Sequence, residues 1–172
     1  MKFNIYFKFL VLFFLIIFTS CDHKENYLQE YDNYENFHNV KNQRLTGWFP
    51  IELIKKDAKK IKNESYLSTK CVFGVFDYNK EELYDSIFTV EANIDSLHYE
   101  IFFSQIKKVD NIIPEWFQNV DYWKMKRTGI ILFDNCYAYR DSEKKQIYYF
   151  HPKEEDTFID GKTYPGIRNT IR

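Results

Sequence analysis

A short apolar run near the amino end limits what the first part of the chain can become. It covers residues 9–18, with Lys2 and Lys8 before it and two small residues and Cys21 after it. A helix that spans a bilayer core of about 30 Å needs roughly 20 apolar residues, and this run is much shorter. A basic start, a short apolar core and a small-residue boundary are the three parts of a secretory signal. The sequence therefore predicts that residues 1–20 are a cleaved signal peptide.

The residues at that boundary resemble the lipobox of bacterial lipoproteins. The segment Phe18-Thr19-Ser20-Cys21 has the same order of an apolar residue, two small residues and a cysteine. In that family the thiol carries diacylglycerol, and the chain is cut just before the cysteine. The resemblance implies that Cys21 is the lipidated first residue of the mature chain, held on a membrane of the cell envelope. A soluble secreted protein and a signal anchor are the alternatives.

The rest of the chain divides into a polar stretch and a longer segment of mixed composition. Residues 21–44 contain no Pro or Gly and are interpreted as the lipidated cysteine and a polar tether. The spacing of the tether's aromatic residues also favours partial helical character. Residues 45–172 are long enough for one domain with its own core and too short for two. We therefore expect a single globular domain over 45–172.

The pattern of this domain predicts one helix followed mainly by strands. Pro50 and apolar residues at helical spacing predict a helix over 50–63, and short helices are expected at 105–109 and 115–120. Gly74 lies inside an expected strand and indicates a bulge or close packing. The fold class is therefore α+β, with one mainly antiparallel sheet and the N-terminal helix packed on it. The last two of the expected strands are separated by a polar hairpin loop. The expected strands are 69–78, 85–90, 96–103, 129–139 and 146–151.

Charge and aromatic content exclude some functions and favour none. The chain has 24 basic and 25 acidic side chains, and Lys2 and Lys8 leave with the signal. The mature chain is therefore slightly acidic, without the basic surface that nucleic-acid binding requires or a polybasic patch for anionic lipid. Aromatic residues make up 20% of the sequence and can supply much of a small core.

Two cysteines remain after Cys21 is assigned to lipid. Cys71 and Cys136 lie in apolar, strand-like segments. An exported domain can form a disulfide between them. Free cysteine is also stable as a small buried hydrophobe, so the sequence leaves both states open.

The sequence contains none of the familiar motifs for a cofactor or a metal. Its five glycines form no phosphate-binding loop. It has no Gly-x-Ser-x-Gly elbow and no His-Glu-x-x-His pair. The cysteines are too isolated to form a zinc or redox motif. We therefore predict no cofactor and no metal.

His151 is the best candidate for chemistry, because it ends an expected strand and is followed by acidic residues. Paired with Asp156 or Asp160, it could act as a general base in a small envelope hydrolase. The neighbouring acids Glu154 and Glu155 also suggest a calcium site, although the spacing differs from that of an EF-hand loop. The alternative is a charged surface loop.

Three tryptophans form a second candidate site. Trp48 and Trp116 are each followed by a phenylalanine and lie close to a proline, and Trp123 comes shortly after. If they were exposed in one row, they would indicate a glycan-binding accessory protein or a protein-binding surface. As core residues, they would be structural.

The residues taken together favour a non-enzymatic role. An expected lipid anchor, a tether and a compact domain without catalytic motifs predict a binding or envelope-accessory module. Its partner would be another envelope protein, or a toxin that it neutralises as an immunity protein. The hydrolase that uses His151 and the glycan-binding protein are the alternatives.

Replacement of Cys21 by Ser tests the anchor, because it removes the thiol that would carry lipid. We expect the variant to lose metabolic labelling with palmitate and to move from the detergent phase to the aqueous phase in Triton X-114 partition. Cys71→Ser, outside the lipobox, should keep both properties. An unlabelled wild-type chain that still enters the detergent phase would identify a signal anchor instead.

Overall fold

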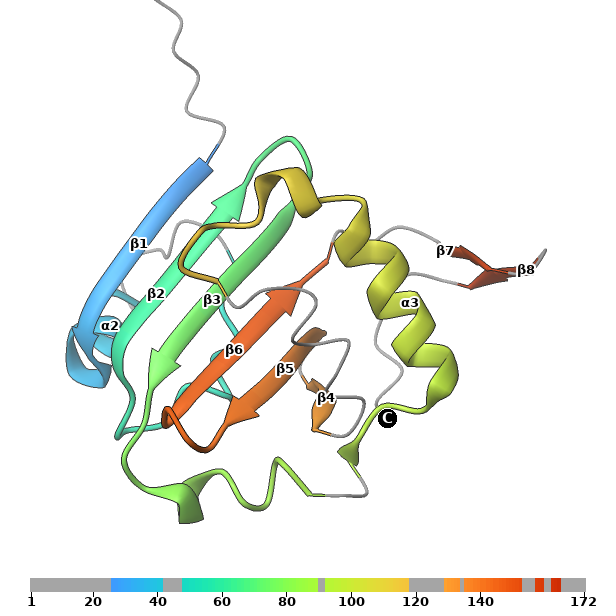
Figure 1. Cartoon of the computed structure of the whole chain (residues 1–172). Coiled ribbons are helices and arrows are strands. Elements are labelled where there is room, and N and C mark those ends of the chain that lie inside the picture. The colour runs from blue at the N-terminus through green and yellow to red at the C-terminus, as the bar shows by residue number, and fades with distance from the viewer. Residues whose placement is uncertain are drawn as a thin grey trace, which may run out of the picture.

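A six-stranded antiparallel sheet is the centre of the molecule. The computed structural model describes residues 26–41, 48–89, 92–117, 129–133, 135–152, 157–159 and 162–164. The strands are adjacent in the order β1-β2-β3-β6-β5-β4 (Figure 1). A separate pair joins β7 (Thr157–Ile159) and β8 (Lys162–Tyr164). The strands of the large sheet are β1 (Asn26–Asn33), β2 (Lys59–Tyr66), β3 (Cys71–Asp77), β4 (Ile130–Phe133), β5 (Cys136–Asp141) and β6 (Gln146–His151).

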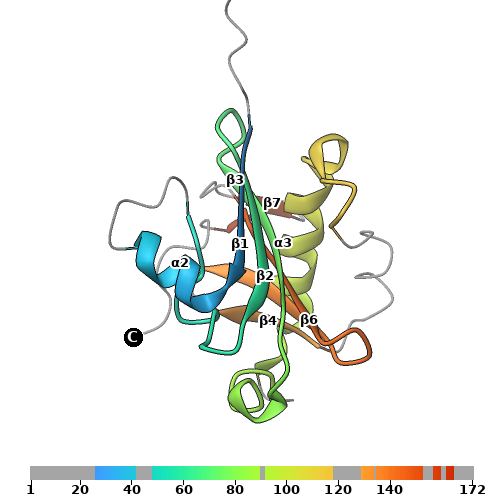
Figure 2. The ribbon, with the colours of Figure 1, turned by 90° about the vertical axis from the view of Figure 1, so that its left-hand side faces the viewer.

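The two α-helices in the described part of the chain lie on opposite faces of this sheet. Helix α2 (Tyr34–Lys41) lies on one face, and α3 (Ser96–Lys107) lies on the other (Figure 2). Short 3₁₀ turns, η1 (Glu81–Leu83) and η3 (Asp110–Ile112), lie in the connections. The α+β class with one antiparallel sheet is confirmed. The position of the expected N-terminal helix is not.

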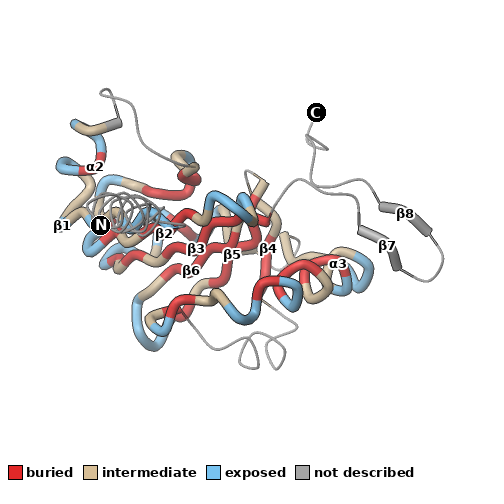
Figure 3. Tube along the Cα trace, turned by 90° about the horizontal axis from the view of Figure 1, so that it is seen from above, coloured by how far each residue is buried: buried red, intermediate tan, exposed pale blue. Residues whose placement is uncertain are grey.

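Each face of the sheet carries its own hydrophobic core, because successive side chains of a strand point to opposite faces. On β3, Val72 and Phe76 point toward the α2 face, and Phe73 points toward the α3 face. Buried residues are concentrated along the central strands (Figure 3). The α3 face is formed largely by aromatic rings, including Phe73, Phe102, Phe117, Tyr137, Tyr148 and Phe150.

The folded domain includes β1, which lies well before residue 45. Residues 26–33 of the expected tether form a strand that pairs with β2, from Asn26 opposite Tyr66 to Asn33 opposite Lys59. Helix α2 follows directly and buries Phe37, which is 1% exposed, against the sheet. The tether interpretation failed here because β1 is polar along most of its length. Its hydrogen-bonding partner in the sheet comes from residues more than 25 positions later.

The expected helix over 50–63 is wrong. Residues 51–54 form turns, and β2 occupies Lys59–Tyr66. Ile54 and Ile61 are buried in one core, as the helical spacing predicted, but a turn followed by a strand places them on the same side equally well. Lys60 has a φ of 49° and lies where the register of the β2–β3 pairing shifts. Such an irregularity bends a strand, and this bend helps the chain pass from the turn into β2.

The expected strand over 96–103 is helix α3. Asp95 caps the helix, because its side chain accepts a hydrogen bond of 2.8 Å from the backbone N–H of His98. Ile101, Phe102 and Ile106 point toward the sheet, at a spacing that only a helix provides. The apolar and polar residues of 96–103 also alternate, so the same segment matches the period of a strand.

The C-terminal strands were predicted more accurately. The expected strand over 146–151 is β6, and residues 142–145 form the turn between β5 and β6. The expected strand over 129–139 is two strands, β4 and β5, because the chain reverses between the paired residues Phe133 and Cys136. Asn135 lies in this reversal with φ of 61°, a conformation that Asn tolerates well.

The remaining short predictions fall outside regular strands. Residues 85–88 form turns and a bend rather than a strand, and Val90 lies outside the described residues. A short helix is expected at 105–109. Residues 105–107 are helical, but they are the last residues of the longer helix α3. Residues 115–117 form a turn, and 118–120 lie outside the described part.

The two candidate disulfide cysteines are buried and are not bonded to each other. Cys71 belongs to the core under α3, and Cys136 belongs to the core on the α2 side. They lie on β3 and β5, and β6 separates these strands. Because the side chains point to opposite faces, a bond between the two sulfurs would require the sheet to be rebuilt.

Gly74 explains how the buried ring of Tyr149 fits at the centre of the sheet. It lies on β3 directly opposite Tyr149 of β6, and the Tyr149 ring lies over it. A Cβ atom at residue 74 would lie 1.9 Å from Cζ of Tyr149. The close packing predicted for this glycine is therefore confirmed, and its reason is contact with an aromatic ring.

Substitution of Gly74 by Ala should force the Tyr149 ring out of place. We expect a loss of about 1–3 kcal/mol in the free energy of unfolding, as in other overpacked cores. Urea denaturation of the mature chain, followed by circular dichroism, measures it. The cost of Gly74→Ala should be much smaller in a Tyr149→Leu background, because the clashing ring is absent. An equal cost in both backgrounds would contradict this explanation.

Candidate functional site

His151 lies at the end of β6, where it is held by two described contacts. Its Nδ1 atom is 2.7 Å from the carbonyl oxygen of Asn135, in the reversal between β4 and β5. Its ring stacks on Trp48, with ring centres 4.0 Å apart and planes 12° apart. The same Trp48 contacts Tyr149 edge-on at 6.4 Å. These contacts fix the orientation of the imidazole and join the segment before Pro50 to the sheet.

The residues expected to act with His151 lie outside the part of the chain that the structure describes. Asp156 and Asp160 lie outside the described residues, as do Glu154 and Glu155. The hydrolase and calcium hypotheses therefore stay predictions. Within the described ranges, no group of three or more His, Cys, Asp or Glu side chains is arranged to hold a metal ion.

The described tryptophans do not form one row. Trp48 packs on the α2 face of the sheet, and Trp116 packs on the α3 face. Trp123 lies outside the described residues. Because the sheet separates Trp48 from Trp116, these two cannot stack on one extended glycan. Trp48 and Trp116 therefore do not form the single exposed row that the glycan-binding hypothesis requires.

A buried polar row that the sequence analysis missed crosses the α2 face. The hydroxyl of Tyr149 donates a hydrogen bond of 2.7 Å to Oδ1 of Asn63, two strands away. Asn63 in turn donates to Oγ of Ser65 at 3.4 Å. Burial raises the pKa of Tyr149 well above its ordinary value, so the phenol stays protonated and remains a donor. The row supplies hydrogen bonds to the core rather than a reactive group.

Glu64, which the sequence analysis did not single out, is a buried carboxylate on the opposite face of the sheet. It is 7% exposed and accepts hydrogen bonds from the side chains of Asn26, Tyr66 and Trp116, at 2.5, 3.0 and 3.2 Å. Burial and the Glu64 carboxylate raise the pKa of Tyr66, which keeps its hydroxyl a donor. Three neutral donors thus satisfy the charge. Through them, Glu64 joins β1 to the segment that follows α3.

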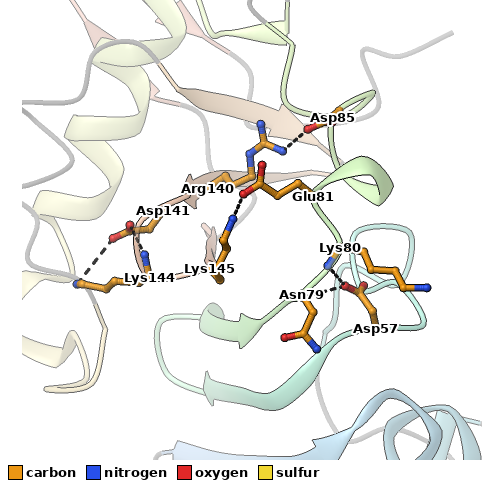
Figure 4. Close-up of polar contacts among 9 residues, drawn as sticks. All are labelled: Asp57, Asn79, Lys80, Glu81, Asp85, Arg140, Asp141, Lys144 and Lys145. Carbon is orange, nitrogen blue, oxygen red and sulfur yellow. Dashed lines mark hydrogen bonds and ion pairs between the residues drawn. The ribbon is translucent and has the colours of Figure 1, made fainter.

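A third polar cluster fastens the loop after β3 to the ends of the strands (Figure 4). The carboxylate of Asp57 accepts hydrogen bonds from the backbone N–H groups of Asn79 and Lys80, at 3.0 and 2.8 Å. Arg140 donates to Asp85 at 2.8 Å, and Lys145 forms an ion pair with Glu81. Asp85 and Glu81 thus have basic partners, and Asp57 has backbone donors. The cluster therefore has the chemistry of a loop clamp.

The outer edge of β1 is the feature that these internal contacts leave open. Among the described residues, β1 pairs only with β2, so its other side is a free edge. The opposite edge strand, β4, is partly covered by an isolated bridge between Asn93 and Ile131. Along β1, Tyr27 and Leu28 are 41% and 50% exposed. A free edge presents backbone donors and acceptors that another strand can pair with.

Comparison with known proteins adds no family. No family model, no curated protein and no solved structure matches this chain. In the part of the chain that the structure describes, no helix is both long and apolar enough to cross a bilayer.

The Tyr149–Asn63 hydrogen bond should contribute measurably to stability. We expect Tyr149→Phe to lower the free energy of unfolding by about 1–2 kcal/mol, because Asn63 Oδ1 is left buried without its donor. Tyr27→Phe, which removes the hydroxyl of an exposed tyrosine, should have no measurable effect. Urea denaturation of both variants, repeated in an Asn63→Ala background, isolates the pair. If Tyr149→Phe lowers the free energy of unfolding by the same amount in the Asn63→Ala background, the loss does not come from the Tyr149–Asn63 hydrogen bond.

Proposed function

We propose that this chain is a lipoprotein that displays a non-enzymatic binding domain in the cell envelope. The lipobox-like segment ending at Cys21 supports the anchor. The free edge of β1 is the observation that supports a binding role. Its partner is another envelope protein, and a toxin neutralised by an immunity-type lipoprotein is one form that such a partner takes.

The β1 edge suits the capture of an extended segment. A partner strand can pair with the free backbone groups of an edge strand, while side chains at alternate positions set specificity. Glu30 and Asp32 are exposed on β1, and the Glu30 carboxylate is 60% exposed despite its ion pair with Lys62. These acids disfavour self-association of the edge and favour a segment that carries Lys or Arg.

The contacts of the other polar groups favour this surface over a catalytic one. His151 is packed against Trp48 and lies within hydrogen-bond distance of a backbone carbonyl. Asn63 and Glu64 are buried in hydrogen-bonded clusters inside the sheet layers. In contrast, the acids of β1 face solvent and are available to a partner.

Photo-crosslinking in the producing cell tests the proposal. A photoreactive residue at Asp32 of the full-length chain should give a discrete adduct with one envelope protein, identified by mass spectrometry. The same residue at Glu100, exposed on α3, should not give that adduct. Reversal of charge by Glu30→Lys should weaken the Asp32 adduct several-fold, because it places a cation opposite the basic segment.

Two controls decide the interpretation. Glu100→Lys, an equal change of charge on the far face, should leave the Asp32 adduct unchanged. His151→Ala should also leave it unchanged if the role is binding at β1. If the photoreactive residue gave the same adduct at positions 32 and 100, the β1 edge would not be the binding surface. The same would follow if Glu30→Lys left the adduct from position 32 unchanged.

A further inference from the structure

The distance between the expected lipid and the folded domain is short. β1 begins at Asn26, five positions after Cys21. Even a fully extended chain spans at most about 3.6 Å per residue, so Asn26 lies within about 18 Å of the lipidated cysteine. A tether that extended to residue 44 would have let the domain move freely above the membrane. The entry of residues 26–33 into the sheet removes that freedom.

One end of the sheet is therefore the end nearest the bilayer. Asn26 is paired with Tyr66, and Tyr66 is paired with Cys71, so the turn between β2 and β3 lies at this same end. The C-terminal end of α3 and the turn η3 also lie there (Figures 1 and 2). The hydrogen bond from Trp116 to Glu64 ties the segment after η3 to β2.

This end carries most of the large exposed apolar side chains. Five such residues occur among the described residues, and three of them lie here: Tyr27, Leu28 and Leu67, at 41%, 50% and 59% exposed. The other two, Leu83 and Leu97, lie in η1 and at the start of α3, away from this end. Leu and Tyr are side chains that insert readily into the interfacial region of a bilayer.

The charges at this end are compatible with a phospholipid surface. Lys70 in the β2–β3 turn and Lys107 and Lys108 at the end of α3 are exposed. Asp110 and Glu115 are exposed nearby and partly balance them. Apolar insertion, rather than attraction between charges, is therefore the main interaction. The lysines can lie among the headgroups.

We propose that the end of the domain formed by Tyr27, Leu28 and the Leu67–Lys70 turn docks on the bilayer that holds the lipid of Cys21. This inference rests on the proposed lipid anchor. The anchor keeps this surface at a high local concentration next to the membrane. Even weak insertion of its side chains is therefore sufficient to hold the domain against the bilayer. The sheet then stands on the bilayer with the outer edge of β1 facing sideways, accessible to a partner in the same membrane.

Fluorescence in vesicles tests the docking. Full-length lipidated protein is reconstituted in phosphatidylcholine–phosphatidylglycerol vesicles with an environment-sensitive dye on a cysteine introduced at Ser68. Cys71 and Cys136 are buried and do not compete for the dye. A quencher carried on the lipid headgroup should reduce emission at least about twofold more at residue 68 than at Leu83→Cys in the matched protein.

Substitutions at the apolar side chains supply the matched comparison. Leu28→Asp with Leu67→Asp should abolish the extra quenching at residue 68, while the protein still floats with the vesicles through its lipid. Leu83→Asp with Leu97→Asp, at two exposed leucines away from this end, should leave the quenching unchanged. Circular dichroism verifies that each variant is folded.

The outcomes separate the docking from the anchor. Flotation of the protein with equal quenching at residues 68 and 83 would overturn the docking and leave the lipid anchor intact. Failure of the wild-type protein to float would overturn the anchor, and the docking would fall with it. Quenching at residue 68 that survives both Asp substitutions would also overturn the role assigned to Leu28 and Leu67.

Discussion

The pairing of β3 with β6 is the interaction on which the rest of the fold depends. It joins residues 72–77 to residues 146–151 and is the contact that links β1-β2-β3 to β4-β5-β6 in one sheet. At its centre, Gly74 leaves room for the Tyr149 ring, whose hydroxyl reaches Asn63 on β2. A side chain on β6 thus bonds to β2 across β3. Both cores are built on the two faces of these central strands.

The polar residues of the sheet serve this architecture and limit what chemistry the described part can perform. Asn63 and Glu64 are adjacent on β2, yet each is satisfied on a different face by partners from distant segments. Buried polar groups are costly unless they are hydrogen-bonded, so these partners are needed for the strand to be buried at all. Among the described residues, the outer edge of β1 has no strand paired with it, and the end of the sheet at Asn26 carries exposed apolar side chains. The proposed binding role uses the first feature, and the proposed docking on the bilayer uses the second.

Some elements could be predicted from the sequence because their signals are local. The apolar residues of β3 and β6 and the polar loop before β6 form short, continuous patterns, and Gly74 indicated close packing. Other elements could not be predicted, because local patterns were ambiguous. In α3 the residues Leu97, Tyr99 and Ile101 alternate with polar ones as in a strand, although Asp95 as a helix cap was a signal for the helix. His151 was singled out as a chemical candidate, but its stacking on Trp48 depends on residues about 100 positions away.

By itself, the sequence determined a basic, apolar start that leads to a lipobox-like cysteine, and a domain of mixed helix and antiparallel strands. These conclusions follow from composition and from runs of neighbouring residues. Only the tertiary structure decided that the polar residues 26–33 belong to the sheet and that Glu64 is buried. The physical reason is that a polar strand is stable inside a protein only when distant residues satisfy its hydrogen bonds. Those partners, Trp116 for Glu64 and Tyr149 for Asn63, are brought into place by folding and leave no pattern in the neighbouring sequence.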